Sequence, residues 1–347
     1  MADRENLLAC LRRQAAGCAV YGSAFYAALL EHVIADVEAG GRTWDVLAPR
    51  SAEPFDAAVV LRFLGAIHRL VLEGRAPTLA RHYPSAGGDG DPHAAWTALD
   101  AFLATGPALE PYLARPPQTN EVSRAAALVG GFLTVAREWG LPLRLLEIGA
   151  SAGLNLRFDH YRYESGGVAF GDPASPVRFV DRWEGTPPFD VACTVVAREG
   201  CDVSPVDPTT PDGHLTLASY VWPDQRERLA VLEGALAVAA RVPARVERAH
   251  AADWLAGRLA EATAGASTVV YHSIAWQYFT PDERDRVRGL LSEAGTRATS
   301  DAPVAWLRLE PAPEQTFAEL RLCAWPGGED HRVATAGFHG VPVAWLG

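Results

Sequence analysis

The stretch at residues 143–155, LRLLEIGASAGLN, decides the fold. A short apolar run ends at Glu147, and Gly149 and Gly153 follow it before a segment of helical character. A buried strand that turns on small residues into a helix is how doubly wound sheets bring backbone amides to a nucleotide-like ligand. A tight strand-to-helix turn that needs small residues only for packing has the same pattern, so the motif leaves both interpretations open.

The sequence around this stretch predicts an α/β fold. Apolar residues recur at helical spacing through most of residues 1–140, and strand-like and helix-like stretches alternate after the glycine turn. Beyond the first strand, we expect strands at 191–197, 244–249, 267–274 and 304–309, helices at 223–240, 254–262 and 281–294, and an antiparallel hairpin at 319–325 and 333–345. This order predicts a doubly wound, Rossmann-like sheet with an antiparallel C-terminal hairpin.

Two domains are expected from a chain of 347 residues. Residues 1–140 are interpreted as a helical N-terminal cap region, and residues 141–347 as the Rossmann-like core. Gly166, Gly167 and nearby prolines interrupt the alternation, which predicts a hairpin inserted into the core around residues 161–190.

The composition narrows the function classes. The net charge of −11 comes with 31 basic residues, all of them arginine, and no lysine. Clustered basic residues are absent, which argues against nucleic acid as a partner, and the lack of lysine excludes the usual P-loop and Schiff-base chemistry. There is no apolar run of membrane-spanning length and no signal-peptide pattern. We therefore expect a cytoplasmic protein with a small-molecule substrate; the oligomeric state is left open.

A metal site is not expected. The five cysteines have no C-x-x-C spacing, and His, Asp and Glu do not cluster at the spacing of metal ligands.

The carboxyl ends of parallel strands meet at one edge of a sheet, where the ligand of a doubly wound fold binds. Under the predicted strand boundaries, this rule selects the turn from Gly149 to Gly153, then Asp202, Asp253 and His272. His272 is the best-placed candidate for a general base, although a histidine bonded within packed structure is an equal alternative. Trp222, Trp276 and Tyr278 are candidates for an apolar acceptor pocket, or plain core residues.

Two further segments carry candidate substrate contacts. Gln118, Asn120 and Glu121 precede the helix that leads into the first strand, and Tyr83 opens the glycine-rich loop 83–92. Helix capping accounts equally well for Asn120 and Glu121, and the loop is equally consistent with a surface linker.

The chain resembles the bacterial family called domain of unknown function 2332 over essentially its whole length. The segments that carry this resemblance are YGSAFYAALL, LGAIHRLVLEGRAP, YPSAGG, QTNEVSRAAAL, EIGASAGLNLRFDHYRY, REGCDVSPVD, YVWPDQRERL, YHSIAWQY and FHGVPVAW. The family resemblance implies no particular activity.

Residues 141–347 also resemble the core of class I S-adenosylmethionine-dependent methyltransferases. LLEIGASAG stands for the glycine-rich first motif, GCDVSPVD for the second-strand motif and HAADW for the third. The resemblance implies S-adenosylmethionine as cofactor, with Asp202 on the ribose hydroxyls and Asp253 on the adenine amine. The remaining implied cofactor contacts are Glu147, Gly149, Ser151, Gly153 and Asn155.

The sequence departs from that superfamily at two points. Ser151 replaces a glycine, and serine has a steric cost at positive φ. Asp202 lies 53 residues after Gly149, against about 20 in the plain fold, so Asp181 is a competing ribose acid.

The leading hypothesis is thus S-adenosylmethionine-dependent methyl transfer, catalysed with His272, to an unidentified small molecule held between cap and core. A second hypothesis is an α/β-hydrolase-like esterase, because Gly149–Gly153 also reads G-x-S-x-G. Ser151 would be its nucleophile, with Asp253 or Asp202 and then His272 or His339 following in order. The third is a Rossmann module that binds a nucleotide-like ligand or a protein without turnover.

Overall fold

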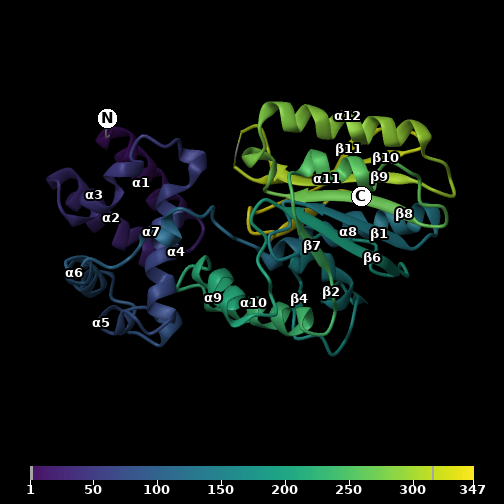
Figure 1. Cartoon of the computed structure of the whole chain (residues 1–347). Helices are drawn as coiled ribbons and strands as arrows, with labels where there is room; N and C mark the ends of the chain where they lie inside the picture. The colour runs from purple at the N-terminus through teal and green to yellow at the C-terminus, as the bar shows by residue number, and fades with distance from the viewer. Residues whose placement is uncertain (1–2, 315) are drawn as a thin grey trace. The chain divides into compact units, whose positions relative to one another are not determined.

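The computed structural model describes residues 3–314 and 316–347, which form two compact units. The helical unit comprises Met1–Thr119 and Thr210–Ala230, and the sheet unit comprises Asn120–Thr209 and Val231–Gly347 (Figure 1). The division differs from the predicted boundary at residue 140. The helix before the glycine turn belongs to the sheet unit, and a segment from the second half of the chain completes the helical unit.

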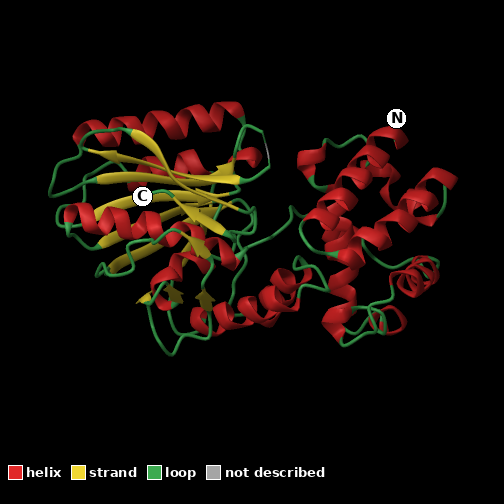
Figure 2. Cartoon of the chain, turned by 180° about the vertical axis from the view of Figure 1, so that it is seen from behind, coloured by secondary structure: helices red, strands yellow, loops and turns green. Residues whose placement is uncertain are grey.

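The helical unit consists of helices and connecting loops (Figure 2). Its α-helices are α1 (Arg4–Val20), α2 (Ala24–Ala39), α3 (Arg42–Leu47), α4 (Val59–Leu72), α5 (Pro77–Ala80), α6 (Pro92–Leu103), α7 (Glu110–Leu113), α9 (Pro211–Ser219) and the start of α10 (Arg226–Ala239). Short 3-10 helices lie at Ala48–Arg50, Phe55–Ala57 and Pro84–Ala86. The apolar faces of α1, α2, α4 and α6 form one core. This core also includes Trp222, which lies in the segment Thr210–Ala230.

Helix α4 is buried along almost its whole length, so its polar side chains need partners inside the unit. His68 bonds the carbonyl oxygen of Ser219 through Nδ1 and the hydroxyl of Ser85 through Nε2, at 3.1 and 2.8 Å. Burial lowers the pKa of His68 to about 4. Arg69 donates to a carboxylate oxygen of Asp212 at 2.6 Å. These contacts attach the inserted segment Thr210–Ala230 to α4.

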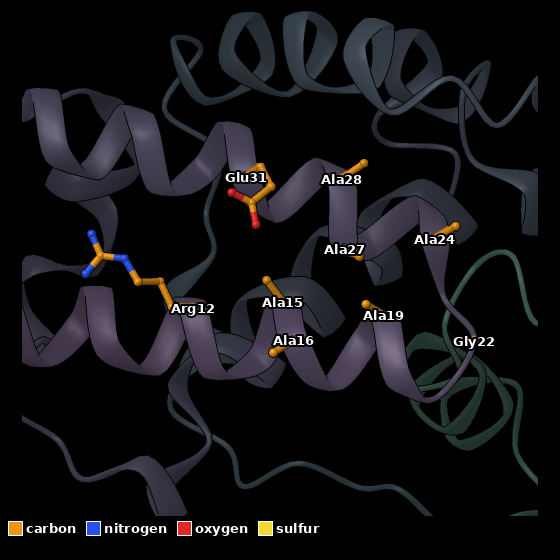
Figure 3. Close-up of a pocket in the computed structure, with 9 residues that line it drawn as sticks. All are labelled: Arg12, Ala15, Ala16, Ala19, Gly22, Ala24, Ala27, Ala28 and Glu31. Carbon is orange, nitrogen blue, oxygen red and sulfur yellow. The ribbon is translucent and has the colours of Figure 1, made fainter.

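Helices α1 and α2 pack through small side chains and leave an open groove of about 610 Å³ between them. Alanines line the groove, with Arg12 and Glu31 toward one end and Gly22 at the other (Figure 3). Small residues at the contact allow two helices to approach closely.

The sheet unit is built on a nine-stranded sheet of order β5-β12-β11-β10-β9-β8-β1-β6-β7. The strands are β1 (Leu143–Ile148), β5 (Trp183–Glu184), β6 (Val195–Asp202), β7 (Arg245–Arg248), β8 (Ser267–Ser273), β9 (Val304–Pro311), β10 (Ala318–Trp325), β11 (Asp330–Ala336) and β12 (Val343–Trp345). Five neighbouring strands, β7, β6, β1, β8 and β9, run parallel. β10, β11 and β12 follow β9 as antiparallel neighbours. The α/β class is therefore confirmed. β10 and β11 form the closing antiparallel hairpin, but the predicted second arm at 333–345 is divided between β11 and β12.

Helices cover both faces of this sheet. α11 (Ala251–Arg258) and α12 (Pro281–Arg297) lie on one face, and α8 (Ala125–Trp139) lies on the other (Figure 1). Gly131 of α8 and Gly295 of α12 allow the close approach, because a Cβ on either would lie within 2.7 Å of Leu307 or Trp325. No helix among residues 3–314 and 316–347 is both long and apolar enough to cross a membrane.

The predicted insertion around 161–190 is more than a hairpin. β2 (Arg162–Ser165), β3 (Val168–Phe170) and β4 (Arg178–Val180) form a separate three-stranded sheet, whereas β5 pairs with β12 at the edge of the large one. A short 3-10 helix, Leu154–His160, stands where the sequence predicts a helix after the glycine turn.

β6 begins four residues later than predicted and ends at Asp202. The charged residues in its second half interrupt the apolar pattern, so the sequence did not predict this half as a strand. Arg198 forms an ion pair with Asp159, and Glu199 forms one with Arg258, at 2.6 and 2.8 Å, so both charges are accommodated within the strand.

We predict that Asp224→Ala destabilises the helical unit. Asp224 accepts hydrogen bonds from the Ser23 hydroxyl at 2.6 Å and from the Phe25 amide at 3.0 Å, at the start of α2. Losing both should lower the free energy of unfolding by about 1–3 kcal/mol, measured by urea unfolding followed by circular dichroism. Asp285→Ala, which removes a 76% exposed side chain on α12, is the control and should change it by less than about 0.5 kcal/mol. Equal effects of the two substitutions would refute this role of Asp224.

Candidate functional site

The candidate site lies at the carboxyl edge of the parallel strands. β1 pairs with β6 on one side and with β8 on the other, all in the same direction. The strand order therefore reverses at β1, since β6 and β7 continue one way and β8 and β9 the other. Ligands of open α/β sheets bind outside the strand ends at this switch point.

The glycine turn follows β1 and has three residues at positive φ. These are Gly149 at 70°, Ser151 at 52° and Gly153 at 65°. A Cβ on Gly149 would lie 2.7 Å from the Cβ of Ala275, and one on Gly153 would lie 2.8 Å from Val246. Both glycines are thus required by packing inside the unit, whatever the turn binds. Ser151 has a backbone conformation in the left-handed region, which has the steric cost for serine expected from the sequence.

Asp202 joins the end of β6 to this turn. Its Oδ2 accepts the amide of Ser151 at 2.9 Å, and its Oδ1 accepts the amide of Ser204 at 2.8 Å. The carbonyl oxygen of Ser151 in turn accepts the amide of Val206 at 3.2 Å. The predicted second-strand acid and the predicted glycine turn therefore form one connected loop pair.

Asn120 and Glu121 also reach the segment that follows the turn. The side-chain oxygen of Asn120 accepts the Leu154 amide at 2.9 Å, and the carbonyl oxygen of Glu121 accepts the amide group of Asn155 at 3.2 Å. Glu121 also caps the 3-10 helix Val122–Arg124 through Oε1. Capping, one of the two interpretations left open, is therefore part of the role of Glu121, whereas the Asn120 side chain bonds the segment after the turn.

Arg124 connects this segment to two further loops. It donates from Nη1 to the carbonyl oxygen of Ser273 at 2.9 Å, and from Nε to that of Phe338 at 3.2 Å. Gly340 lies against the same segment, since a Cβ there would be 2.3 Å from the Ser123 carbonyl oxygen. The segments VSR (122–124), YHS (271–273) and FHG (338–340) thus meet at this edge of the sheet.

Glu147 lies beneath the turn in the interior of the unit. It is 1% exposed, and its Oε2 accepts the Tyr271 hydroxyl at 3.1 Å. Burial raises the pKa of Glu147 to about 8, against the lowering effects of the Tyr271 bond and of Arg157. Its carboxyl group is therefore mostly neutral at neutral pH.

His272 at the end of β8 is paired with Glu310, a residue that the sequence analysis missed. The two are joined by a 2.6 Å contact between Nδ1 and Oε1. His272 is fully buried, and the ring of Trp276 stacks on it at a centroid distance of 4.9 Å. Glu310 could have been found by the rule that selected Asp202, because it also follows the apolar part of a parallel strand. It directly follows the predicted end of the fifth parallel strand at 309, but only the ends of the first four strands were considered.

Other predicted site residues lie elsewhere. Asp253 is in the first turn of α11, largely exposed, and forms an ion pair with Arg286 at 2.6 Å. Asp181 is exposed and follows β4 of the small sheet. Asp253 lies on a helix because β7 ends at Arg248 and α11 begins at Ala251. Asp181 lies away from the large sheet because the insertion forms a sheet of its own.

Tyr83, Gln118 and Trp222 belong to the helical unit. Tyr83 is a fully buried core residue rather than part of a surface loop, because its ring packs against Phe25, Tyr26 and His68. Gln118 is 7% exposed, and Trp222 is in the core of the unit. Within the described part of the chain, no three His, Cys, Asp or Glu side chains gather as metal ligands would.

Comparison with known proteins identifies one family. The sequence model described as "Uncharacterized protein conserved in bacteria (DUF2332)" matches residues 9–345. Neither a curated protein nor a solved structure gives a significant match.

The raised pKa of Glu147 predicts how stability changes with pH. The folded chain keeps this proton up to about pH 8, whereas the unfolded chain releases it near the ordinary value of 4.5. The folded state binds more protons between these values, so Glu147 makes the free energy of unfolding fall by about 1.4 kcal/mol per pH unit as pH rises.

Glu147→Gln should remove this dependence. The stability of the variant relative to the natural chain is expected to grow steadily between about pH 5 and pH 8, measured by urea unfolding at each pH. Glu261→Gln changes an exposed residue and should give a curve parallel to that of the natural chain. A parallel curve for Glu147→Gln would show that Glu147 is ionised in the folded state.

Proposed function

Since the chain belongs to the bacterial DUF2332 family, whose description names no reaction, we propose from the site itself that it is an S-adenosylmethionine-dependent methyltransferase of small molecules. The observation that carries the proposal is the hydrogen bond that the Ser151 amide donates to Asp202 Oδ2. It places a carboxylate from the second strand directly at the glycine turn of the first. A nucleoside ligand needs both elements together, the turn for close approach and the acid for ribose hydroxyls.

The strand order supports the proposal. β7-β6-β1-β8-β9 is the 3-2-1-4-5 arrangement of nucleotide-binding doubly wound sheets, with the candidate site at its switch point. The same edge brings in Asn120 and Glu121 from before β1 and the loop after β8.

The residues at the turn fit the cofactor. The glycine turn and Asp202 would hold it, and Asn155 supplies an additional acceptor. Its Oδ1 is buried and receives no hydrogen bond from any described residue, so an amino group of a ligand can satisfy it. Bound S-adenosylmethionine supplies a sulfonium-activated methyl group, which leaves the protein to align the acceptor and exclude water.

His272 is the group of this chain that we assign to the acceptor. It lies at the end of β8, beside the loop whose Ala275 packs against Gly149. Its burial next to Trp276 keeps water from the ring. A histidine in such a place can take the proton that an acceptor oxygen or nitrogen loses on methylation.

The hydrolase alternative is less well supported. Asp202 bonds the backbone of Ser151, Asp253 pairs with Arg286, and His272 pairs with Glu310. The histidine is therefore partnered by an acid other than the two that a Ser151 triad was expected to use.

We predict that the protein binds S-adenosylmethionine and its demethylated product, and that Asp202→Asn weakens this binding about 10–100-fold. The loss corresponds to that of a hydrogen bond to a charged acceptor. Isothermal titration calorimetry with both compounds measures it. Asp253→Asn is the matched control, because this exposed acid is already paired with Arg286, and it should keep the affinity within about threefold.

Absence of binding by either compound at millimolar concentration would overturn the proposal. A weakening by Asp253→Asn equal to that by Asp202→Asn would overturn the assignment of Asp202. Binding without methyl transfer to any acceptor in a broad small-molecule panel would favour a binding module.

The hydrolase alternative is tested by Ser151→Ala. We expect the purified protein to hydrolyse p-nitrophenyl acetate no faster than the Ser151→Ala variant does. A rate that falls at least 100-fold on this substitution would instead identify Ser151 as a nucleophile.

A further inference from the structure

One oxygen of Glu310 accepts three hydrogen bonds at the end of β9. Oε1 receives the amide of Ala275 at 3.0 Å and the amide of Trp276 at 3.2 Å. Its third contact is with His272 Nδ1, at 2.6 Å. The carboxylate thus holds the histidine and the loop after β8 together.

These backbone bonds settle which nitrogen of His272 carries the proton. A backbone amide can only donate, so Oε1 acts as an acceptor toward Ala275 and Trp276. The hydrogen in the Nδ1–Oε1 contact must then come from Nδ1. In the neutral imidazole, Nε2 is consequently the nitrogen with the free lone pair.

The free acceptors of this pair have no partner among the residues that the structure describes. His272 Nε2 and Glu310 Oε2 are buried and receive no hydrogen bond there, and Trp306 Nε1 nearby makes none. A buried polar atom left unsatisfied costs about 1–3 kcal/mol. Three such atoms in one cluster point to a ligand that donates to the acceptors and accepts from the indole.

The surroundings of His272 are aromatic. Trp276 stacks on the imidazole at an interplanar angle of 11°, and the ring of Trp306 lies 6.0 Å away. Arg288 and Arg308 lie over these two indoles, at 5.3 and 4.1 Å from the ring centroids. The indoles separate the histidine from water, which strengthens a hydrogen bond to it.

The loop after β8 covers one face of His272 through Trp276. Ile274 begins this loop at a φ of 50°, a strained value for a β-branched residue. Gln277 and Tyr278 behind it are exposed, in a single 3-10 turn. The turn therefore lies between the buried imidazole and solvent.

We propose that Glu310 is the positioning residue of His272, fixing the Nδ1-protonated tautomer so that Nε2 accepts the proton of the methyl acceptor. This inference rests on the proposed methyl transfer. In that step the acceptor's O–H or N–H bond breaks and its proton goes to Nε2, while the acceptor atom bonds the methyl carbon and the carbon–sulfur electron pair stays on sulfur. Glu310 then faces the imidazolium through Nδ1.

The tautomer can be read directly by NMR of the full chain labelled with ¹⁵N-histidine. Long-range ¹H–¹⁵N spectra distinguish a protonated ring nitrogen from one with a free lone pair, and His272→Gln identifies the signals of His272. We expect Nδ1 protonated and Nε2 free in the natural chain. Glu310→Gln should preserve this pattern because its amide oxygen accepts the same three donors. Glu310→Ala should lose it.

Glu319→Ala is the matched control. Glu319 stands opposite Glu310 in the β9–β10 ladder and pairs with Arg332, so its removal should leave the His272 signals unchanged. A proton on Nε2 in the natural chain would overturn the inference, and so would an unchanged tautomer in Glu310→Ala. If Glu310→Ala does not fold, loss of the Nδ1-protonated pattern in Glu310→Gln overturns it instead.

Calorimetry on the same samples separates the two proposals. Failure of the natural chain to bind S-adenosylmethionine refutes the methyltransferase while leaving the tautomer result standing. If the cofactor binds, Glu310→Ala should keep its affinity within about threefold. A larger loss would show that Glu310 supports the cofactor site instead of the acceptor site.

Discussion

The position of β1 at the centre of the parallel strands is the constraint on which the sheet unit depends. Both of its edges are paired and its side chains are almost all buried, so only its carboxyl end is free to carry a loop. Because β6 and β8 run in the same direction, their loops emerge beside it. Ala275 then lies against Gly149, and Asp202 reaches Ser151. The residues that each loop can carry are therefore restricted by the loops that it contacts.

The sequence predicts those parts of the fold whose burial is visible in the local pattern. β8 and α12 are found almost as expected, since one is a continuous apolar run and the other a charged amphipathic helix with a capping threonine. The second half of β6 was not predicted, because Arg198 and Glu199 interrupt the apolar pattern and are accommodated by ion pairs that the sequence does not show. The transfer of Thr210–Ala230 to the helical unit was not foreseen. Periodicity shows that a face is buried, but not which core buries it.

The candidate site was predicted where backbone geometry carries the signal. Ser151 and Asp202 come together as the strand-end rule implies, and the side chain of Asn120 bonds Leu154 just after the turn. Asp253 does not join them, because α11 begins at Ala251, soon after β7 ends at Arg248, and Asp253 is a surface acid in the first turn of that helix. Glu310 directly follows a predicted strand end, yet its pairing with His272 was not foreseen. A pairing between side chains from two strands has no counterpart in the spacing of either one.

The segment Thr210–Ala230 also determines when the helical unit can be completed during synthesis. The start of α2 is held by Asp224, about 200 positions further along the chain. The ribosome makes α1 to α7 first, yet their last partner appears only after about a hundred further residues, roughly 5–20 s later. During that interval, the side chains of α4 that contact Thr210–Ala230 in the folded unit have no partner from that segment. The order of translation therefore gives the sheet unit time to begin folding before the first-made unit is finished.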